Sequence, residues 1–475
     1  MKASRAADPM SLAVLTAASL AVLCAVPAQY LGRQQDDLLY IISSQALAAG
    51  GYRLFTTPGQ PPIDMITPGL PLLLLPATWL SGGAVWAYQA FAALLLAGVP
   101  WLIWIWLRRR ADETTALLIA ALFATSPLVL SQAGTVMSEG AYTLCAVLLM
   151  LTLESKDGGG KAGLLLLTLT QLRPAALSLV PAALLRPLLR RQWSALAWTT
   201  LPAIIGGFLW TAWSWAVSGR IQELAELRLS YQDSSWLHPL FVAKANLLYY
   251  AAALGGCFLP PGFPPALKAA LGLALFAVAA AGCAKLLRKD RSEPAVWLLA
   301  GGAAMHGLWA WQYERYLIPL LAWLLWSAAA ALGRRAKPVL GLLLAAQLVF
   351  HSWRFIAGPN DLQRVELAQT YAWLREHSGP ADILASPLFI RDGYHAARLS
   401  VPLPDDPSPE GLLKTLKARR VSKILWQDGL EVGLSDGQDA GLQRLLERAG
   451  ALLRSERFKL VYENPEERSR VYEPR

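Results

Sequence analysis

Charged residues are scarce in this chain. Asp, Glu, Lys and Arg make up 16% of its 475 residues, whereas hydrophobic residues make up 55%, and the mean hydropathy is +0.37. A water-soluble protein of this length needs a larger charged surface around its core, so the composition excludes a single soluble globular protein. We therefore interpret the chain as a polytopic α-helical membrane protein.

Cysteine is also scarce. The four cysteines lie in apolar surroundings, no two have CxxC spacing, and none lies in the last 122 residues. This pattern argues against a disulfide framework or a cysteine-based metal site. We interpret the four as packing residues.

The apolar runs stop at residue 353, which divides the chain into a membrane part, 1–353, and a soluble part, 354–475. The soluble part contains 18 Lys and Arg and 18 Asp and Glu, whereas the membrane part contains 25 and 15. The net charge of +10 therefore belongs to the membrane part, where basic residues gather on cytoplasmic loops. The charge pattern gives no reason to expect a nucleic-acid partner.

Alternating strand-like and helix-like runs predict that 354–475 is a small α/β domain. The predicted elements are strands at 382–387 and 422–427, helices at 409–419 and 440–450, and a closing hairpin at 458–473.

The basic clusters predict the membrane topology, because Lys and Arg mark cytoplasmic ends. We expect an uncleaved N-terminal signal anchor with a cytoplasmic N-terminus, an external first loop at 29–84, and an extracytoplasmic C-terminal domain. Residues 219–265 are expected to be external or reentrant. About eleven crossings result, with spans at about 11–29, 85–107, 114–132, 139–154, two half-helices within 162–186, 194–217, 266–287, 295–312, 316–332 and 338–353.

This topology gathers ionisable residues on the outer side of the membrane. The pair Asp36–Asp37 follows the first span, Glu139 lies at the tip of a helical hairpin, and a break at Arg173–Pro174 lifts Arg173 outward. Arg315 joins them from the loop before 316–332. Charged groups at this depth are costly unless they are paired or line a cavity, so we expect a functional site here.

The residue types suggest a reaction. A carboxylate can take a proton from an acceptor hydroxyl or amine, and arginines can bind a phosphate through two hydrogen bonds each. Together they suit group transfer from a phosphorylated lipid. The alternative is that these residues have only structural roles, as the polar flanks of helix ends, as interfacial anchors or as a structural charge network.

Several stretches, in order, resemble one family. They are Asp36-Asp37-x-x-Tyr40 followed by "ALAAGGYRLFTTPGQPP", "MSEGAYTLCAVLL" with Glu139, "LTQLRPAALSLVPAALL" with Arg173, "ERYLIPLL" with Arg315 and Tyr316, and "YAWLREHSGPADILAS". They resemble the bacterial GT-C membrane glycosyltransferases of family 39, the protein O-mannosyltransferase-like group that includes the aminoarabinose transferases.

The resemblance implies the GT-C fold and an inverting transfer of a sugar from a polyprenyl-phosphate donor to a lipid, glycan or protein acceptor. It implies that Asp36 is the catalytic base or orients the acceptor, and that Asp37 and Glu139 are supporting acidic residues. Arg173 and Arg315 match positions suited to the lipid phosphate, and Tyr40 and Tyr316 belong to the same motifs. The resemblance implies no certain cofactor; a divalent cation on Asp36, Asp37 and Glu139 is left open.

It further implies that the protein resides in the cytoplasmic membrane, among its lipids. The main alternative is a transporter or flippase for a lipid-linked or envelope substrate, which would place polar residues near the bilayer midplane. A second alternative is a non-catalytic assembly partner with a docking tail. Hexosyl and pentosyl transfer are not distinguished.

Overall fold

The computed structural model describes residues 8–26, 31–32, 36–155, 159–221, 224, 231, 237–309, 311–352, 354, 366–428 and 446–475. The chain forms two compact units. The first comprises Met1–Pro27, Thr67–Leu73 and Ala84–Asn360, and the second comprises Ala28–Ile66, Leu74–Gly83 and Asp361–Arg475. The stretch between the first two long apolar runs is thus divided, with 67–73 in the first unit and 28–66 and 74–83 in the second.

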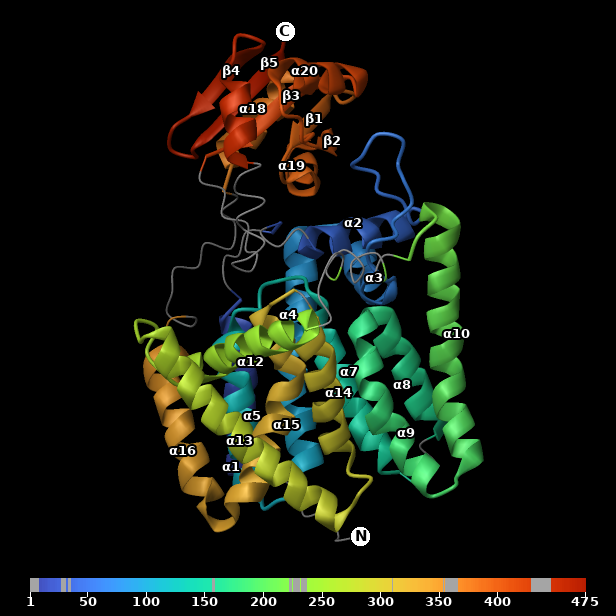
Figure 1. Cartoon of the computed structure of the whole chain (residues 1–475), viewed down its shortest axis with the longest axis vertical. Coiled ribbons are helices and arrows are strands. Elements are labelled where there is room, and N and C mark those ends of the chain that lie inside the picture. The colour runs from blue at the N-terminus through green and yellow to red at the C-terminus, as the bar shows by residue number, and fades with distance from the viewer. Residues whose placement is uncertain are drawn as a thin grey trace. The chain divides into compact units, whose positions relative to one another are not determined.

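The first unit is helical (Figure 1). Its elements are α1 (Pro9–Cys24), α4 (Val85–Leu107), α5 (Glu113–Ala124), α6 (Pro127–Leu130), α7 (Ser138–Leu153), α8 (Gly159–Leu172), η1 (Pro174–Leu179), α9 (Val180–Leu189), α10 (Trp193–Ser218), α12 (His238–Gly256), α13 (Pro265–Lys289), α14 (Pro294–Leu308), η2 (Glu314–Leu317), α15 (Ile318–Leu332), η3 (Gly333–Arg335), α16 (Ala336–Gln347) and η4 (Leu348–Ser352).

Four of these stretches are long and apolar enough to cross a membrane: Val85–Leu107, Trp193–Ser218, Pro265–Lys289 and Glu314–Ser352. Shorter apolar helices accompany them, among them α1, α5 and α7. The chain is thus suited to be a multi-pass membrane protein. The number of about eleven crossings stays a prediction.

The predicted break at Arg173–Pro174 is confirmed. Helix α8 ends at Leu172, Arg173 has extended backbone angles (φ −158°, ψ 138°), and Pro174 opens the 3-10 helix η1. Proline has no N–H to continue α8, and it disfavours a helical conformation for the residue before it. The sequence therefore makes the chain break at Arg173, between two apolar helices.

Glycines let α13 pack closely against its neighbours. A Cβ on Gly272 would lie 1.8 Å from the carbonyl oxygen of Ala251 in α12, and one on Gly282 would lie 1.7 Å from that of Ser327 in α15. Membrane helices gain most of their mutual attraction from such close backbone contact, because lipid is as apolar as their side chains. These two glycines fix α13 between α12 and α15.

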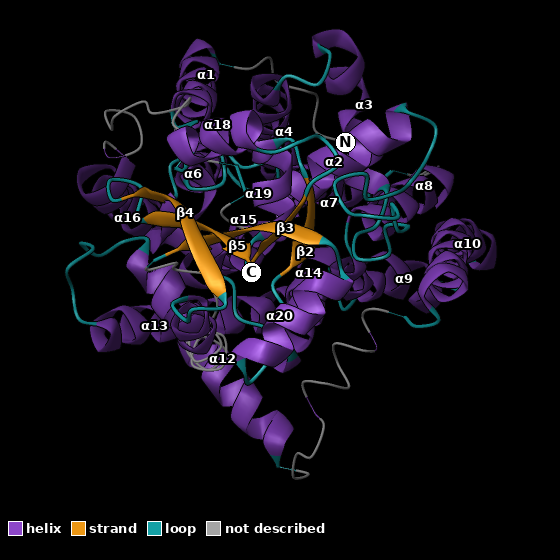
Figure 2. Cartoon of the chain, turned by 90° about the horizontal axis from the view of Figure 1, so that it is seen from above, coloured by secondary structure: helices purple, strands orange, loops and turns teal. Residues whose placement is uncertain are grey.

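The second unit contains a five-stranded sheet in the order β2-β1-β3-β5-β4 (Figure 2). The strands are β1 (Ile383–Ser386), β2 (Leu399–Pro402), β3 (Val421–Gln427), β4 (Phe458–Asn464) and β5 (Ser469–Pro474). β1 is parallel to β2 and β3, whereas β5 is antiparallel to β3 and β4. Helices α19 (Phe389–Ala396) and α20 (Pro409–Ala418) make the crossovers that parallel strands require.

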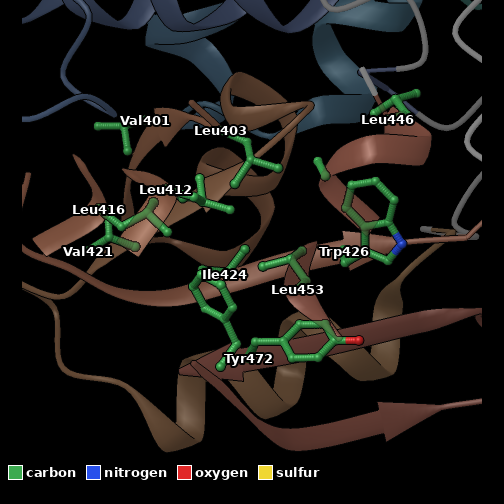
Figure 3. Close-up of a cluster of buried hydrophobic side chains, with 13 residues drawn as sticks. Val401, Leu403, Leu412, Leu416, Val421, Ile424, Trp426, Leu446, Leu453 and Tyr472 are labelled. Atoms are coloured by element: carbon green, nitrogen blue, oxygen red, sulfur yellow. The ribbon is translucent and has the colours of Figure 1, made fainter. Parts of the chain in front are cut away.

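Both faces of this sheet are covered. One face packs against α20 and the helical residues 446–453, and Leu412, Ile424, Trp426 and Leu453 lie in this cluster (Figure 3). The other face packs against α18 (Ala368–His377) and α19 through a second cluster that includes Leu425. Successive residues of β3 point to opposite faces, as a strand requires.

The predicted α/β class of this domain, its strands at 382–387 and 422–427 and its closing hairpin are confirmed. Helices α18 and α19 and the short strand β2 were not predicted. Residues 440–445 of the predicted helix 440–450 lie outside the described residues, and 446–450 are helical.

The expected first loop is more structured than the sequence suggested. It contains α2 (Asp36–Ala48), a turn between Arg53 and Pro62, and the apolar helix α3 (Gly69–Ser81). Residues 28–66 and 74–83 group with the C-terminal domain, whereas 67–73 group with the first unit. The division at 353 did not anticipate this grouping.

Candidate functional site

Glu139 lies at the centre of a buried charge cluster in the first unit. It occupies the first turn of α7 and its side chain is 1% exposed. The positive end of the helix dipole favours a carboxylate at this position. A carboxylate buried this deeply would still be costly without charged partners.

Two arginines supply those partners. Oε1 of Glu139 accepts a hydrogen bond from Nη1 of Arg173, and it lies 3.1 Å from Nε of Arg315. The arginine side chains are 16% and 8% exposed, so water screens these pairs poorly. Taken together, these two guanidiniums and one carboxylate carry one net positive charge.

Local backbone breaks place both arginines. Arg173 precedes η1, and Arg315 is the second residue of η2, so neither lies inside an α-helix. α7, η1 and η2 all begin at the cluster, and the N–H groups at a helix start favour negative charge. The predicted residues Glu139, Arg173 and Arg315 are thus brought together from three distant segments.

Aromatic rings surround the guanidiniums. The guanidinium carbon of Arg173 lies 5.1 Å from the ring centre of Tyr316, and that of Arg315 lies 4.3 Å from the ring of Tyr313. His306 of α14 stacks on Tyr316, with 4.9 Å between ring centres and 24° between planes. These contacts hold the cations by attraction to ring faces without neutralising them.

The remaining predicted residues lie in the second unit, on α2. Asp37 is 2% exposed, and its carboxylate accepts N–H bonds from Gly32 at 3.0 Å and from Leu38 at 2.8 Å. Tyr40 is 8% exposed. Asp36, the first residue of α2, is partly exposed. The adjacent aspartates therefore differ in burial, since Asp37 is buried with its carboxylate on backbone N–H groups whereas Asp36 is partly exposed.

Solved structures resemble this arrangement of helices and C-terminal sheet, although no protein-family model and no curated protein sequence matches the chain. ArnT from Cupriavidus metallidurans, bound to undecaprenyl phosphate, matches with a TM-score of 0.57 and 11% identity over 98% of each chain. The oligosaccharyltransferase of Archaeoglobus fulgidus, tethered with an acceptor peptide, matches with a TM-score of 0.58 and 12% identity over 96% of this chain and 73% of its own. Both are GT-C glycosyltransferases. This chain has the GT-C fold.

The likeness confirms, at the level of fold, the resemblance seen in the sequence motifs. At these identities it establishes the architecture of the GT-C chain and not its reaction.

Sequence reasoning missed part of the arginine cluster of this GT-C chain. His306, Tyr313 and Asn246 were not singled out. Nδ2 of Asn246 donates to the carbonyl oxygens of His306 at 2.9 Å and Trp309 at 2.7 Å, which fixes the end of α14. The available signal was His306, a lone polar side chain within the apolar helix α14, because such residues are rare in membrane spans.

The described part of the GT-C chain contains no group of three or more His, Cys, Asp or Glu side chains that could hold a metal ion. Two of the three carboxylates left open for a cation, Glu139 and Asp37, have other partners. Glu139 faces two guanidiniums, which repel cations, and Asp37 accepts backbone N–H groups. Glu139 and Asp37, with these partners, are therefore poorly suited to bind a divalent cation.

Proposed function

We propose that this chain is a membrane glycosyltransferase. It transfers a sugar from a polyprenyl-phosphate donor to a lipid, glycan or protein acceptor, with inversion at the anomeric carbon. The site faces the outer side of the cytoplasmic membrane, with the N-terminus cytoplasmic and the C-terminal domain extracytoplasmic. The GT-C fold supports the class of enzyme, and the cluster of Arg173, Glu139 and Arg315 is the observation that carries the proposal.

The cluster suits a lipid phosphate because it brings two arginines together. Glu139 contacts both guanidiniums and orients them, and the three side chains together carry one net positive charge. Guanidiniums pair with phosphate oxygens through two N–H bonds, whereas an acidic site would repel the donor phosphate. ArnT, which has this fold, has been seen bound to undecaprenyl phosphate.

Asp36 is the proposed base. In the transfer, the acceptor oxygen or nitrogen forms a bond to the anomeric carbon while the bond from that carbon to the phosphate oxygen breaks. The acceptor proton passes to the Asp36 carboxylate, and the electron pair of the broken bond leaves with polyprenyl phosphate. Arg173 and Arg315 stabilise the charge that develops on this leaving group.

Asp37 and Tyr40 support the base in this proposal. Asp37 accepts backbone N–H bonds from Gly32 and Leu38, which holds the start of α2, where Asp36 lies, in place. Tyr40 lies one turn further along α2, on the side of the aspartates. Tyr316 contacts Arg173 and keeps its guanidinium turned toward the phosphate.

The test is transfer of label from a panel of radiolabelled polyprenyl-phosphate sugars to cell-envelope acceptors by purified protein in lipid. The parent is compared with Asp36→Asn and with the control Asp64→Asn, since Asp64 is partly exposed in the same unit and has no proposed role. We expect label from one donor with the parent and the control, and at least a hundredfold loss with Asp36→Asn.

Transfer at the parental rate by folded Asp36→Asn would overturn the assignment of the base. Failure of every donor with well-folded parent would overturn the transferase, and movement of intact donor across the membrane would then favour a flippase.

A further inference from the structure

Helix α19 and strand β2 contact the segment that contains Asp36 and Asp37, within the second unit. α19 lies beside α2 (Figure 1), and Nε2 of Gln45 in α2 donates to the hydroxyl of Tyr394 at 3.3 Å. Past α2, the carbonyl oxygen of Thr56 accepts an N–H bond from Ser400 of β2 at 2.8 Å. The segment is therefore attached to the C-terminal domain at and beyond α2.

A third attachment lies just before α2. Nε2 of His395 in α19 bonds to the carbonyl oxygen of Leu31 at 3.1 Å. Gly32 has a φ of +96°, and a Cβ there would lie 2.6 Å from Cγ of Arg391. Gly32 in turn donates its N–H to Asp37. A continuous set of contacts thus runs from α19 through residues 31–32 to the start of α2.

α19 is itself held by a buried ionic network. The carboxylate of Asp392 accepts hydrogen bonds from the hydroxyl of Tyr371 at 2.5 Å and from Nε of Arg391 at 2.6 Å, and also from Ser386. Arg391 and Asp392 are at most 2% exposed. The ring of His395 stacks on Tyr371, with 5.4 Å between centres and 21° between planes. A buried network with its partners in place allows few alternative arrangements, so α19 is a rigid support.

We propose that His395 is a positioning residue for the transfer reaction: through Leu31 and Gly32 it fixes the start of α2 and so the direction of the Asp36 carboxylate. This inference rests on the proposed function. His395 does not touch the reacting atoms. Its loss should leave donor binding by the arginine cluster intact and misplace the base, and a displacement of about 1 Å at a reacting group can lower a rate about a hundredfold.

The test compares His395→Leu, which removes the donor to Leu31, with His395→Gln, whose amide N–H can replace it. The matched control is His377→Leu, because His377 is an exposed histidine of the same domain that stacks on Trp373. Gly32→Ala disturbs the same attachment of residues 31–32 to α19, because the added Cβ would meet Arg391. Two quantities are measured: hydrogen exchange of the backbone amides of residues 38–48, and the steady-state kcat and KM for the sugar donor that the parent uses.

We expect His395→Leu and Gly32→Ala to exchange faster in 38–48 and to lose at least about tenfold in kcat, with KM for the donor within twofold of the parent. His395→Gln should recover most of the rate, and His377→Leu should match the parent. Unchanged exchange in 38–48 or unchanged kcat in His395→Leu would overturn the inference and leave the proposed function standing. A rise in KM equal to the loss in kcat/KM would also overturn it. A parent that transfers no sugar overturns the proposed function. The exchange data still decide whether the contact of His395 with Leu31 fixes the start of α2.

Discussion

Replacing Arg173 with methionine tests whether the net charge of Arg173, Arg315 and Glu139 attracts the donor phosphate. In the parent, Arg173, Arg315 and Glu139 sum to one positive charge, and in Arg173→Met they sum to zero. Two unit charges about 5 Å apart interact by about 3 kcal/mol at an effective dielectric constant of about 20. Because about 1.4 kcal/mol corresponds to a tenfold change, donor affinity should fall about a hundredfold.

The double variant Arg173→Met with Glu139→Gln is the matched control, since Arg315 then remains with its full charge and no carboxylate to neutralise it. Its net charge equals that of the parent, so it should recover a measurable part of the lost affinity. The assay is equilibrium binding of a short-chain polyprenyl phosphate to protein in lipid nanodiscs. Affinity of Arg173→Met within threefold of the parent would refute the electrostatic reasoning. A double variant no better than the single one would show that geometry, and not charge, controls binding.

Two further predictions concern stability. Gly282→Ala should lower the thermal unfolding temperature in detergent far more than Gly341→Ala. A Cβ on Gly282 would meet a carbonyl oxygen of α15 at 1.7 Å, whereas nothing lies within 4 Å of a Cβ on Gly341. Equal shifts in unfolding temperature would contradict the packing argument. Burial lowers the pKa of His395 below its usual 6.5, with nearby arginines acting in the same direction and the Leu31 carbonyl and Asp392 opposing it. Protons then bind the unfolded chain more readily, so the free energy of unfolding should be constant well above pH 6.5 and fall as the pH drops below it. Chemical unfolding from pH 8 to pH 5 checks this, and His395→Gln should flatten the slope.

The sequence predicted those features that depend on local chemistry. Pro174 breaks α8 because of its own ring, and the alternation in β3 follows from the two faces of a strand. The association of Glu139 with Arg173 and Arg315 was expected only from topology and motif order, because these residues are 34 and 176 positions from Glu139 and no periodicity relates them.

The attachment of α2 to the C-terminal domain had no sequence signal. The bond between Ser400 and Thr56 joins residues 344 positions apart through backbone groups, which every residue carries. α19 escaped prediction because it has only eight residues and contains Gly393, and β2 has only four. Tertiary contact stabilises such short elements, and the local pattern does not.

The span between Thr56 and Ser400 also sets an order in time. A ribosome adds about 5–20 residues per second, so roughly 15–70 seconds separate the synthesis of the acidic segment from that of the helix and strand that hold it. Throughout that interval the nascent chain has the proposed base, Asp36, without the helix and strand that we infer to position it. On the proposed function, transfer would begin only once the C-terminal residues 361–475 have folded against this segment, so that partly made chains would not consume the donor.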